Sequence, residues 1–255
     1  MDIENKYGTL EIQKSLLILL KVFDDFCYKN NIVYSLDSGS LLGVIRHKGF
    51  IPWDDDLDVV MDRKNYNRLI SCICGDSESI NLVIERNTPE SLWVDRIHMK
   101  NYNNDSQYMP TIDIFLFDNV PNNKYLAKLK VLFLLMLQGM MKPRLNIKKG
   151  NLAMKCLSII TWVVGLLIPR RIKYNWYNKV SSLCNKNVST YGSCYNYPFH
   201  GMGHKFDSDV LDCIIRMPFE SIEVPVMKKY DHYLTTIYGD YLTPPKKEER
   251  IPKHL

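Results

Sequence analysis

The stretch FIPWDDDLDVV, residues 50–60, places four aspartates within five positions: Asp54, Asp55, Asp56 and Asp58. From Asp56 onward, acidic and apolar residues alternate with the two-residue period of a β-strand. Leu57 and Val59 are expected to face a core. Asp56 and Asp58 are expected to share the opposite face of the same strand, over residues 57–61.

Carboxylates this close together repel one another unless a cation or hydrogen bonds offset their charge. Asp113 lies in a second alternating apolar run, TIDIF, with Ile112 and Ile114 on the opposite face. If the two strands are neighbours, Asp113 becomes the third carboxylate of a site for Mg²⁺, which prefers oxygen ligands. An acidic loop in water, with Asp113 as a solvent-facing strand residue, is the alternative interpretation.

The segment DSGSLLG, residues 37–43, follows a short β-rich run over residues 32–36. We expect a turn over residues 37–40 and a helix beginning at Leu41, an arrangement that presents backbone N–H groups to an anion. Gly39 and Ser40 are the candidate phosphate-side residues of this turn. Arg46 follows them and is expected either to bind a donor phosphate or to be an ordinary surface arginine.

Two strand aspartates, a third carboxylate and a Gly-Ser turn together favour transfer of a phosphoryl-containing group from a nucleotide donor. In this chemistry Mg²⁺ bridges phosphate oxygens and neutralises charge on the leaving group. A carboxylate could orient or deprotonate the attacking hydroxyl. Trp53 is interpreted as an apolar wedge beside the aspartates, with contact to a quaternary ammonium as the alternative.

The remaining pattern mixes helices with strands, which suggests an α+β or α/β sheet layer. We expect the α+β class, with a mixed sheet flanked by helices. Helices are expected at residues 9–31 and 64–73, and strands at 81–86, 93–101 and 110–121. Residues 124–187 carry helical and basic patterns without comparable strand signals. We therefore predict one domain over residues 1–255 with a helical, basic insertion at about 124–187.

Two apolar runs, residues 131–141 and 156–168, are shorter than the roughly 18 to 20 residues that span a bilayer. Each has basic neighbours, so they are expected either to be core helices or to dock on the inner membrane face. The net charge of +5 is too small to indicate general nucleic-acid binding. The odd number of cysteines and the absence of a secretory-type amino terminus favour a cytoplasmic protein.

Three segments resemble one known family: SLDSGSLLGVIRHKGFIPWDDDLDVVM at 35–61, PTIDIFLFDNVP at 110–121 and YDHYLTTIYGDYLTPPKKEER at 230–250. They closely resemble the LicD family, which includes bacterial phosphorylcholine transferases and is related to fukutin-type proteins with a nucleotidyltransferase-like core. The resemblance implies a metal-dependent enzyme that moves a phospho-substituent, such as phosphocholine from CDP-choline, onto a glycan of lipopolysaccharide, teichoic acid or capsule, or onto its lipid-linked precursor.

By residue, the resemblance matches Asp56 and Asp58 to the metal-binding aspartates, and Gly39 and Ser40 to the phosphate-side turn. Asp113 matches the third carboxylate, for Mg²⁺ or Mn²⁺, although Asp95 and Asp118 are also near it in sequence. The carboxy-terminal segment is expected to pack against the core without catalytic residues.

Two other functions stay open from the sequence. A nucleotidyltransferase would use the same metal site but release pyrophosphate instead of a nucleoside monophosphate. A non-catalytic scaffold of a glycan-assembly complex would use the two apolar, basic stretches for membrane association.

Overall fold

The computed structural model describes residues 7–75, 80–102, 109–145, 152–198 and 201–252. The chain forms two compact units. The first, here called the site unit, comprises Met1–Ile84, Arg96–Leu116 and Asp209–Leu255; the second, the helical unit, comprises Glu85–Asp95 and Phe117–Ser208. Consecutive strands are followed by consecutive helices, and the strand pairs with a defined register are antiparallel, so the predicted α+β class is confirmed.

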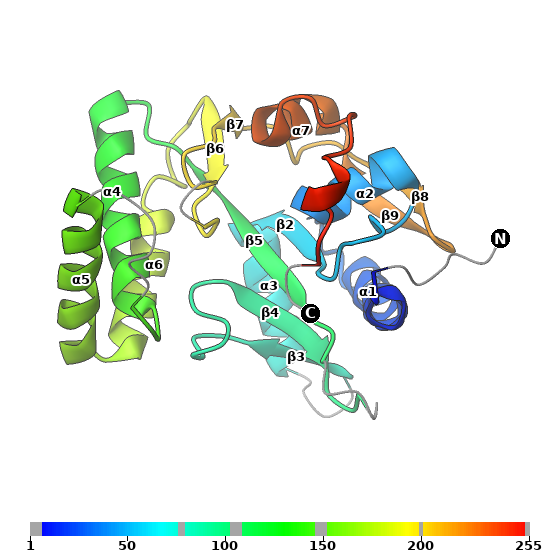
Figure 1. Ribbon diagram of the computed structural model, residues 1–255, viewed down its shortest axis with the longest axis horizontal. Helices are drawn as coiled ribbons and strands as arrows, with labels where there is room; N and C mark the ends of the chain where they lie inside the picture. Colours follow the sequence, from blue (N-terminus) through cyan, green and yellow to red (C-terminus); the bar gives the residue numbers. More distant parts are fainter. Residues whose placement is uncertain (1–6, 76–79, 103–108, 146–151, 199–200, 253–255) are drawn as a thin grey trace. The chain divides into compact units, whose positions relative to one another are not determined.

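The site unit is built on a sheet with the strand order β1-β2-β5-β4-β3 (Figure 1). Its strands are β1 (Ser35–Leu36), β2 (Asp58–Asp62), β3 (Leu82–Glu85), β4 (Asp95–Met99) and β5 (Ile112–Asn119). β1 and β2 are antiparallel, with Ser35 opposite Val60. The predicted strands near residues 57–61, 81–86, 93–101 and 110–121 are all present, whereas the run over 32–36 is reduced to two strand residues.

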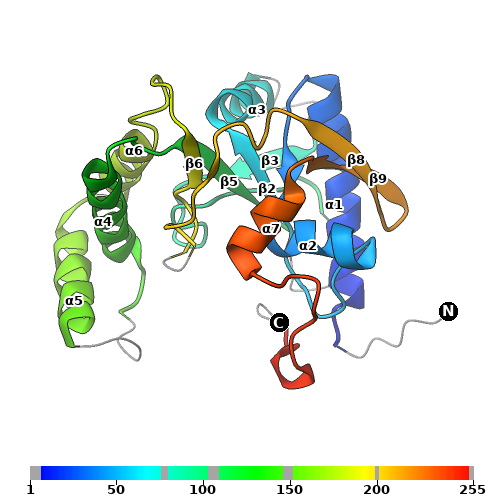
Figure 2. The same ribbon diagram turned by 90° about the horizontal axis from the view of Figure 1, so that it is seen from above.

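Helices and one hairpin complete the site unit (Figure 2). These elements are α1 (Leu10–Lys29), α2 (Ser38–His47), α3 (Arg63–Gly75), α7 (Tyr230–Tyr238), the short 3₁₀ helix η1 (Lys247–Glu249), and the strands β8 (Ile214–Phe219) and β9 (Ile222–Met227). The long amphipathic α1 confirms the helix expected over 9–31, because Leu16, Leu19 and Phe23 are fully buried at helical spacing. α2 and α7 lie side by side in both views.

The hairpin β8–β9 was not predicted from the sequence. Its two-residue turn follows Phe219, which pairs with Ile222, and Glu220 adopts a positive φ of 52°. Glu220 donates from its backbone N–H to the carbonyl of Lys48 at 2.8 Å, and its Oε1 accepts from the backbone N–H of Phe50 at 3.0 Å. The hairpin therefore fixes the segment that leads into the aspartate run.

The helical unit contains α4 (Lys124–Met141), α5 (Leu152–Leu167) and α6 (Arg170–Ser181), which lie together in both views (Figures 1 and 2). The end of β5 pairs with β6 (Tyr191–Cys194), which in turn pairs with β7 (Phe206–Asp207). The unit has its own core, formed by apolar residues of α4, α6 and the β6 segment. Its members include Leu134, Leu137, Tyr174, Tyr177 and Tyr195.

α4 and α5 approach one another through glycines. A Cβ added at Gly165 would come within 2.7 Å of the Cα of Met140, and one added at Gly139 would contact the side chain of Thr161. Lys173 of α6 is buried and donates from Nζ to the carbonyl oxygens of Met140 at 2.9 Å and Gly165 at 2.6 Å. This contact satisfies carbonyls at the ends of α4 and α5. The two apolar runs, 131–141 and 156–168, are thus parts of a packed helix pair.

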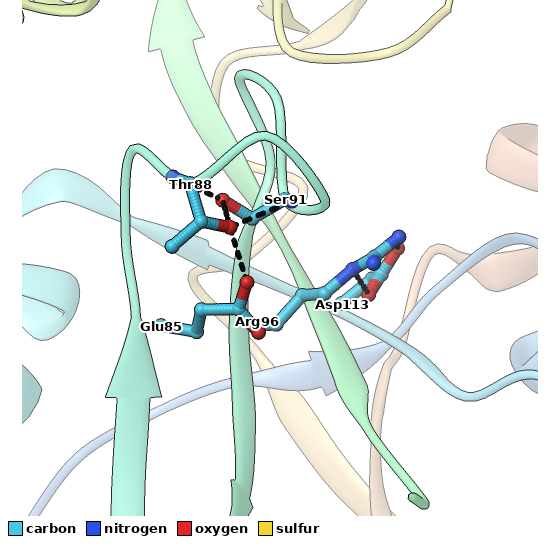
Figure 3. Close-up of polar contacts among 5 residues, drawn as sticks. All are labelled: Glu85, Thr88, Ser91, Arg96 and Asp113. Atoms are coloured by element: carbon cyan, nitrogen blue, oxygen red, sulfur yellow. Dashed lines mark hydrogen bonds and ion pairs between the residues drawn. The ribbon is translucent and has the colours of Figure 1, made fainter. Parts of the chain in front are cut away.

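The loop after β3 is held by side-chain hydrogen bonds within the helical unit. Thr88 donates from Oγ1 to Glu85 and accepts at the same oxygen from the backbone N–H of Ser91 at 3.0 Å (Figure 3). Arg170 of α6 donates from Nε to the carbonyl of Asn87 at 3.1 Å. These bonds satisfy polar groups of the loop without regular secondary structure.

Candidate active site

The amino terminus of α2 is defined by Asp37. Its fully buried carboxylate accepts from the backbone N–H of Ser38 at 2.7 Å and from the hydroxyl of Tyr233 at 2.8 Å. The prediction of a turn over 37–40 with a helix from Leu41 is wrong by three residues, since α2 begins at Ser38. Aspartate is a preferred N-cap residue, and this signal could have placed the boundary correctly.

Ser40 connects α2 to the aspartate-bearing strand. Its buried hydroxyl accepts from the backbone N–H of Asp58 at 2.9 Å. The backbone N–H of Asp37 also donates to the carbonyl of Asp58 at 2.9 Å. The first turn of α2 and the start of β2 are therefore held in a fixed relative position.

Gly39 is needed for close approach of an acidic side chain. A Cβ at position 39 would lie 2.8 Å from Oδ2 of Asp54. Negative charge is favoured near the amino terminus of a helix, where unpaired N–H groups and the helix dipole are positive. Gly39 thus leaves room for Asp54 beside the first turn of α2.

The aspartate run alternates in burial as expected for extended chain. Leu57 and Val59 are fully buried, whereas Asp56 and Asp58 are partly exposed. β2 begins at Asp58, so the expectation that Asp56 lies in the same strand is wrong; it immediately precedes the strand. Asp55 is 2% exposed and therefore belongs to the buried side of the segment.

Asp113 is brought to the aspartate run because β5 is the neighbour of β2. The backbone N–H of Asp113 donates to the carbonyl of Leu57 at 2.9 Å. Burial raises the pKa of Asp58 well above its ordinary value, and the nearby charges of Asp56, Asp113, Asp37 and Asp54 raise it further. The carboxylates predicted from separate segments therefore form one electrostatic cluster.

Arg96 of β4 was not predicted as a site residue. It donates from Nε to Oδ1 of Asp113 at 2.8 Å, with Nη2 3.5 Å from Oδ2 (Figure 3). Both side chains are partly exposed, at 29% and 24%. The sequence offered one signal, because Arg96 and Asp113 both occupy polar positions on alternating strands.

Within the part of the chain that the structure describes, no three His, Cys, Asp or Glu side chains form a group that could hold a metal ion. The donor set nevertheless suits a hard divalent cation. Asp56 and Asp58 are partly exposed carboxylates in a cluster whose mutual repulsion a cation would relieve. Asp113 also accepts from Arg96, with Nε at 2.8 Å from Oδ1 and Nη2 at 3.5 Å from Oδ2.

Asp95 and Asp118, the other acidic residues near Asp113 in sequence, belong to the helical unit. Asp95 accepts from the hydroxyl of Tyr174 at 2.6 and 2.7 Å. Asp118 accepts from Nδ2 of Asn185 at 2.5 Å. Both are buried and engaged in the packing of that unit.

Three basic side chains lie around the ring of Trp53. The guanidinium carbons of Arg250 and Arg46 lie 5.1 and 5.9 Å from the Trp53 ring centroid, and the His47 ring lies edge-on to it at 6.2 Å. Burial lowers the pKa of His47, and the charges of Arg46 and Arg250 lower it further. Nε of Arg46 and Nδ1 of His47 are buried and lack hydrogen-bond partners among the described residues.

These contacts describe the surroundings of two residues whose roles the sequence left open. Arg46 is a partly buried residue that donates from Nη1 to the carbonyl of Tyr241 at 3.2 Å, not an isolated surface arginine. Trp53 stacks with cations of the protein itself. Arg250 was missed because it lies about two hundred residues away in sequence, in a segment with no independent phosphate-binding signal.

The carboxy-terminal segment supplies tyrosines to the site. Tyr233 donates to Asp37, as described above. Burial raises the pKa of Tyr238, and the charges of Asp58 and Asp37 raise it further, so this phenol also lies within the field of the carboxylates. The segment expected only to pack against the core therefore contributes polar groups to the candidate site.

Part of the chain matches a known family model. Residues 31–134 match the family model described as LicD/FKTN/FKRP, nucleotidyltransferase domain. The chain is 27% identical over 270 residues to the lipopolysaccharide cholinephosphotransferase LicD of Haemophilus influenzae, covering 96% of this chain and 97% of that protein.

Two shorter matches are more similar in sequence. Uncharacterised proteins of Rickettsia prowazekii and Rickettsia typhi are each 53% identical over 45 residues, which cover 18% of this chain and 17% and 15% of those proteins. The findings confirm the resemblance indicated by the motifs and support a LicD-type phosphotransferase. Residues 31–134 are therefore similar to the LicD family model, and the likeness to a LicD protein extends over nearly the whole chain.

Proposed function

We propose that this protein transfers phosphocholine from CDP-choline to a hydroxyl of a lipopolysaccharide glycan or its lipid-linked precursor. The name of the Haemophilus relative, a lipopolysaccharide cholinephosphotransferase, supports phosphocholine as the transferred group and lipopolysaccharide as the acceptor. The observation that carries the proposal is the cluster of Asp56, Asp58 and Asp113 beside the amino terminus of α2. A nucleotidyltransferase-like fold is part of the same proposal.

The reaction is a displacement at the choline-bearing phosphorus of the donor. The acceptor oxygen forms a new P–O bond, and the bond between this phosphorus and the bridging oxygen breaks. CMP leaves with the bridging oxygen, and the acceptor hydroxyl loses its proton. Catalysis of such a step is mostly positioning and stabilisation of charge on phosphate oxygens.

Asp56, Asp58 and Asp113 are the residues that we propose hold a divalent cation. A bound Mg²⁺ or Mn²⁺ would neutralise charge on the donor pyrophosphate and on the leaving CMP. Arg96 positions Asp113 through the 2.8 Å bond to Oδ1. A carboxylate of the cluster accepts the proton of the acceptor hydroxyl.

Cationic and N–H donor groups would bind the donor phosphates. Arg46 and Arg250 lie over Trp53, and Nε of Arg46 is buried without a partner among the described residues. Such a donor is costly to bury unless a ligand accepts from it. Backbone N–H groups at Gly39 and Ser40, in the first turn of α2, supply further positive potential.

The helical unit is proposed to contact the inner face of the membrane from the cytoplasm. None of the described helices combines the length and apolar character needed to cross a bilayer. However, the α4–α5 pair exposes many large apolar side chains. Examples are Leu126, Leu129, Ile160, Leu166 and Leu167, which are 56% to 81% exposed.

The charge of this part of the chain suits anionic lipid. Between Asn119 and Phe206 the sequence contains basic residues throughout and no Asp or Glu. Exposed apolar residues with cationic neighbours are typical of proteins that lie at an anionic bilayer surface. An acceptor attached to a lipid would be reached from this position.

Product analysis tests the proposed reaction directly. The protein is incubated with CDP-choline, Mg²⁺ and lipopolysaccharide that lacks phosphocholine, and nucleotide products are separated. Phosphocholine transfer releases CMP in a one-to-one ratio with choline in the glycan. Pyrophosphate release from a nucleoside triphosphate would instead identify a nucleotidyltransferase, and no nucleotide binding or turnover would identify a scaffold.

A further inference from the structure

The helical unit contains a cavity of about 390 Å³ between α4 and the segment that carries β6 and β7. Its volume lies within the usual range of small-molecule sites, roughly 300 to 1,000 Å³. It is formed within one compact unit and is lined by none of the residues of the candidate active site. The cavity is therefore a separate candidate binding site.

The walls of the cavity are apolar. They are formed by Val120, Ala127, Val131, Leu135, Tyr195 and Met202. Four of these, including Tyr195 and Met202, are buried members of the core of the unit. One wall is fixed by Lys130, whose Nζ lies 3.9 Å from the Tyr195 ring centroid and donates to the carbonyl of Asn119 at 3.0 Å. The apolar walls are therefore suited to binding the hydrocarbon chain of a ligand.

The polar part of the lining is cationic. Lys124 and Lys128 of α4 lie one helical turn apart, and His204 and Lys205 come from the opposite segment. None of the lining residues is acidic. Nδ1 of His204 is buried and lacks a hydrogen-bond partner among the described residues. A buried polar nitrogen in a cavity that three lysines also line favours a ligand that carries an acceptor group with negative charge.

We propose that this cavity binds a lipid phosphate, with its apolar chain against the Tyr195 wall and its phosphate near Lys124, Lys128, Lys205 and His204. The proposal does not require that the active site transfers phosphocholine. Only the identification of the lipid as the carrier of the glycan acceptor rests on the proposed function.

The experiment measures binding of dodecyl phosphate to the full chain by calorimetry, below the concentration at which the probe forms micelles. We expect saturable binding of dodecyl phosphate that neither inorganic phosphate nor dodecyl maltoside reproduces. Lys128→Glu should weaken binding by about tenfold or more, because charge-assisted hydrogen bonds are lost and repulsion is introduced. Val131→Trp should block the cavity.

Lys179→Glu is the matched control, since Lys179 is an exposed lysine of α6 outside the cavity. The affinity of the Lys179→Glu variant for dodecyl phosphate should equal that of the unaltered protein. Equal weakening by Lys128→Glu and Lys179→Glu would show general charge attraction and overturn the proposal. Equal binding of dodecyl maltoside would show adsorption of detergent and overturn it too.

Competition identifies the source of the lipid. Farnesyl phosphate represents a lipid-linked glycan carrier, and dihexanoyl phosphatidic acid represents a membrane phospholipid. Displacement of dodecyl phosphate by either compound supports the proposal, and displacement by neither contradicts it. Because no turnover is measured, failure here leaves the phosphocholine transfer experiment unaffected.

Discussion

Arg96 donates to Asp113 over 2.8 Å, so the third carboxylate of the candidate site is oriented by a cation from the neighbouring strand (Figure 3). This bond joins Nε to Oδ1, and Nη2 of Arg96 lies 3.5 Å from Oδ2. Residues that orient metal ligands commonly affect metal affinity nearly as much as the ligands themselves. Arg96 is therefore expected to control how well Asp113 serves a divalent cation.

Arg96→Gln should raise the Mg²⁺ concentration needed for half-maximal phosphocholine transfer by roughly 10- to 100-fold. The glutamine keeps a hydrogen-bond donor but loses the charge and the fork geometry. Arg216→Gln is the matched control, because it removes a similar bond to Asp24, 2.5 Å long, elsewhere in the same unit. An unchanged Mg²⁺ requirement in Arg96→Gln would show that Asp113 does not depend on this arginine.

Gly39→Ala should lower transfer activity although alanine is the better helix former. The added methyl would lie 2.8 Å from Oδ2 of Asp54, so the carboxylate must move away from the first turn of α2. Measuring Gly39→Ala with and without Asp54 separates the effect of the Asp54 contact from the effect of helix propensity. In an Asp54→Ala background, Gly39→Ala should have little further effect on activity and should raise the melting temperature. Equal effects in both backgrounds would exclude the Asp54 contact as the reason.

Binding of a nucleotide is expected to be coupled to proton uptake by His47. In the free protein, burial lowers the pKa of His47, and the charges of Arg46 and Arg250 lower it further, so the neutral imidazole is favoured. A phosphate bound among these groups would offset the positive charge and raise that pKa. Near the ordinary histidine pKa of about 6.5, binding should therefore take up protons.

Calorimetry with CMP in buffers of different ionisation enthalpy measures this uptake. His47→Gln should abolish it, whereas His232→Gln, which alters an exposed histidine of α7, should preserve it. Proton uptake that is unchanged in His47→Gln would place the phosphate elsewhere.

Leu166→Glu should weaken binding of the protein to vesicles that contain anionic phospholipid by about tenfold or more. This loss corresponds to the free energy gained when one leucine side chain is buried in the bilayer. Leu166 is 66% exposed on α5. Leu242→Glu provides the control, because Leu242 is 62% exposed in the site unit. Co-sedimentation measures both variants. If the two lose binding equally, the α4–α5 face has no specific role.

The sequence was informative where a local pattern determines the structure. Alternation correctly predicted that Leu57 and Val59 are buried and that 57–61 and 110–121 contain strands. It supported but could not decide the pairing of β2 with β5, which the structure confirms. α2 begins three residues before the expected position because Asp37 caps the helix, whereas Gly39 and Ser40 by themselves have a high turn propensity.

Long-range contacts were not predictable in the same way. Arg96, Tyr233 and Arg250 reach the site from three other segments, and a single sequence contains no local pattern that pairs them with the aspartates. The β8–β9 hairpin was also missed. Its two apolar runs each contain a proline, Pro218 and Pro225, which weakens the strand pattern.

The central claim is that the aspartate cluster carries out phosphocholine transfer, and Asp58→Asn tests it most directly. Asp62→Asn, at the other end of β2, is the matched control. The measurement is CMP release from CDP-choline in the presence of acceptor, with the melting temperature checked for each variant. We expect the transfer rate of Asp58→Asn to fall by about a thousandfold. A loss of this size corresponds to several kcal/mol of charge stabilisation in the transition state. Its melting temperature should not fall, because one repelling charge is removed. Turnover of folded Asp58→Asn at a rate close to that of Asp62→Asn would contradict the account.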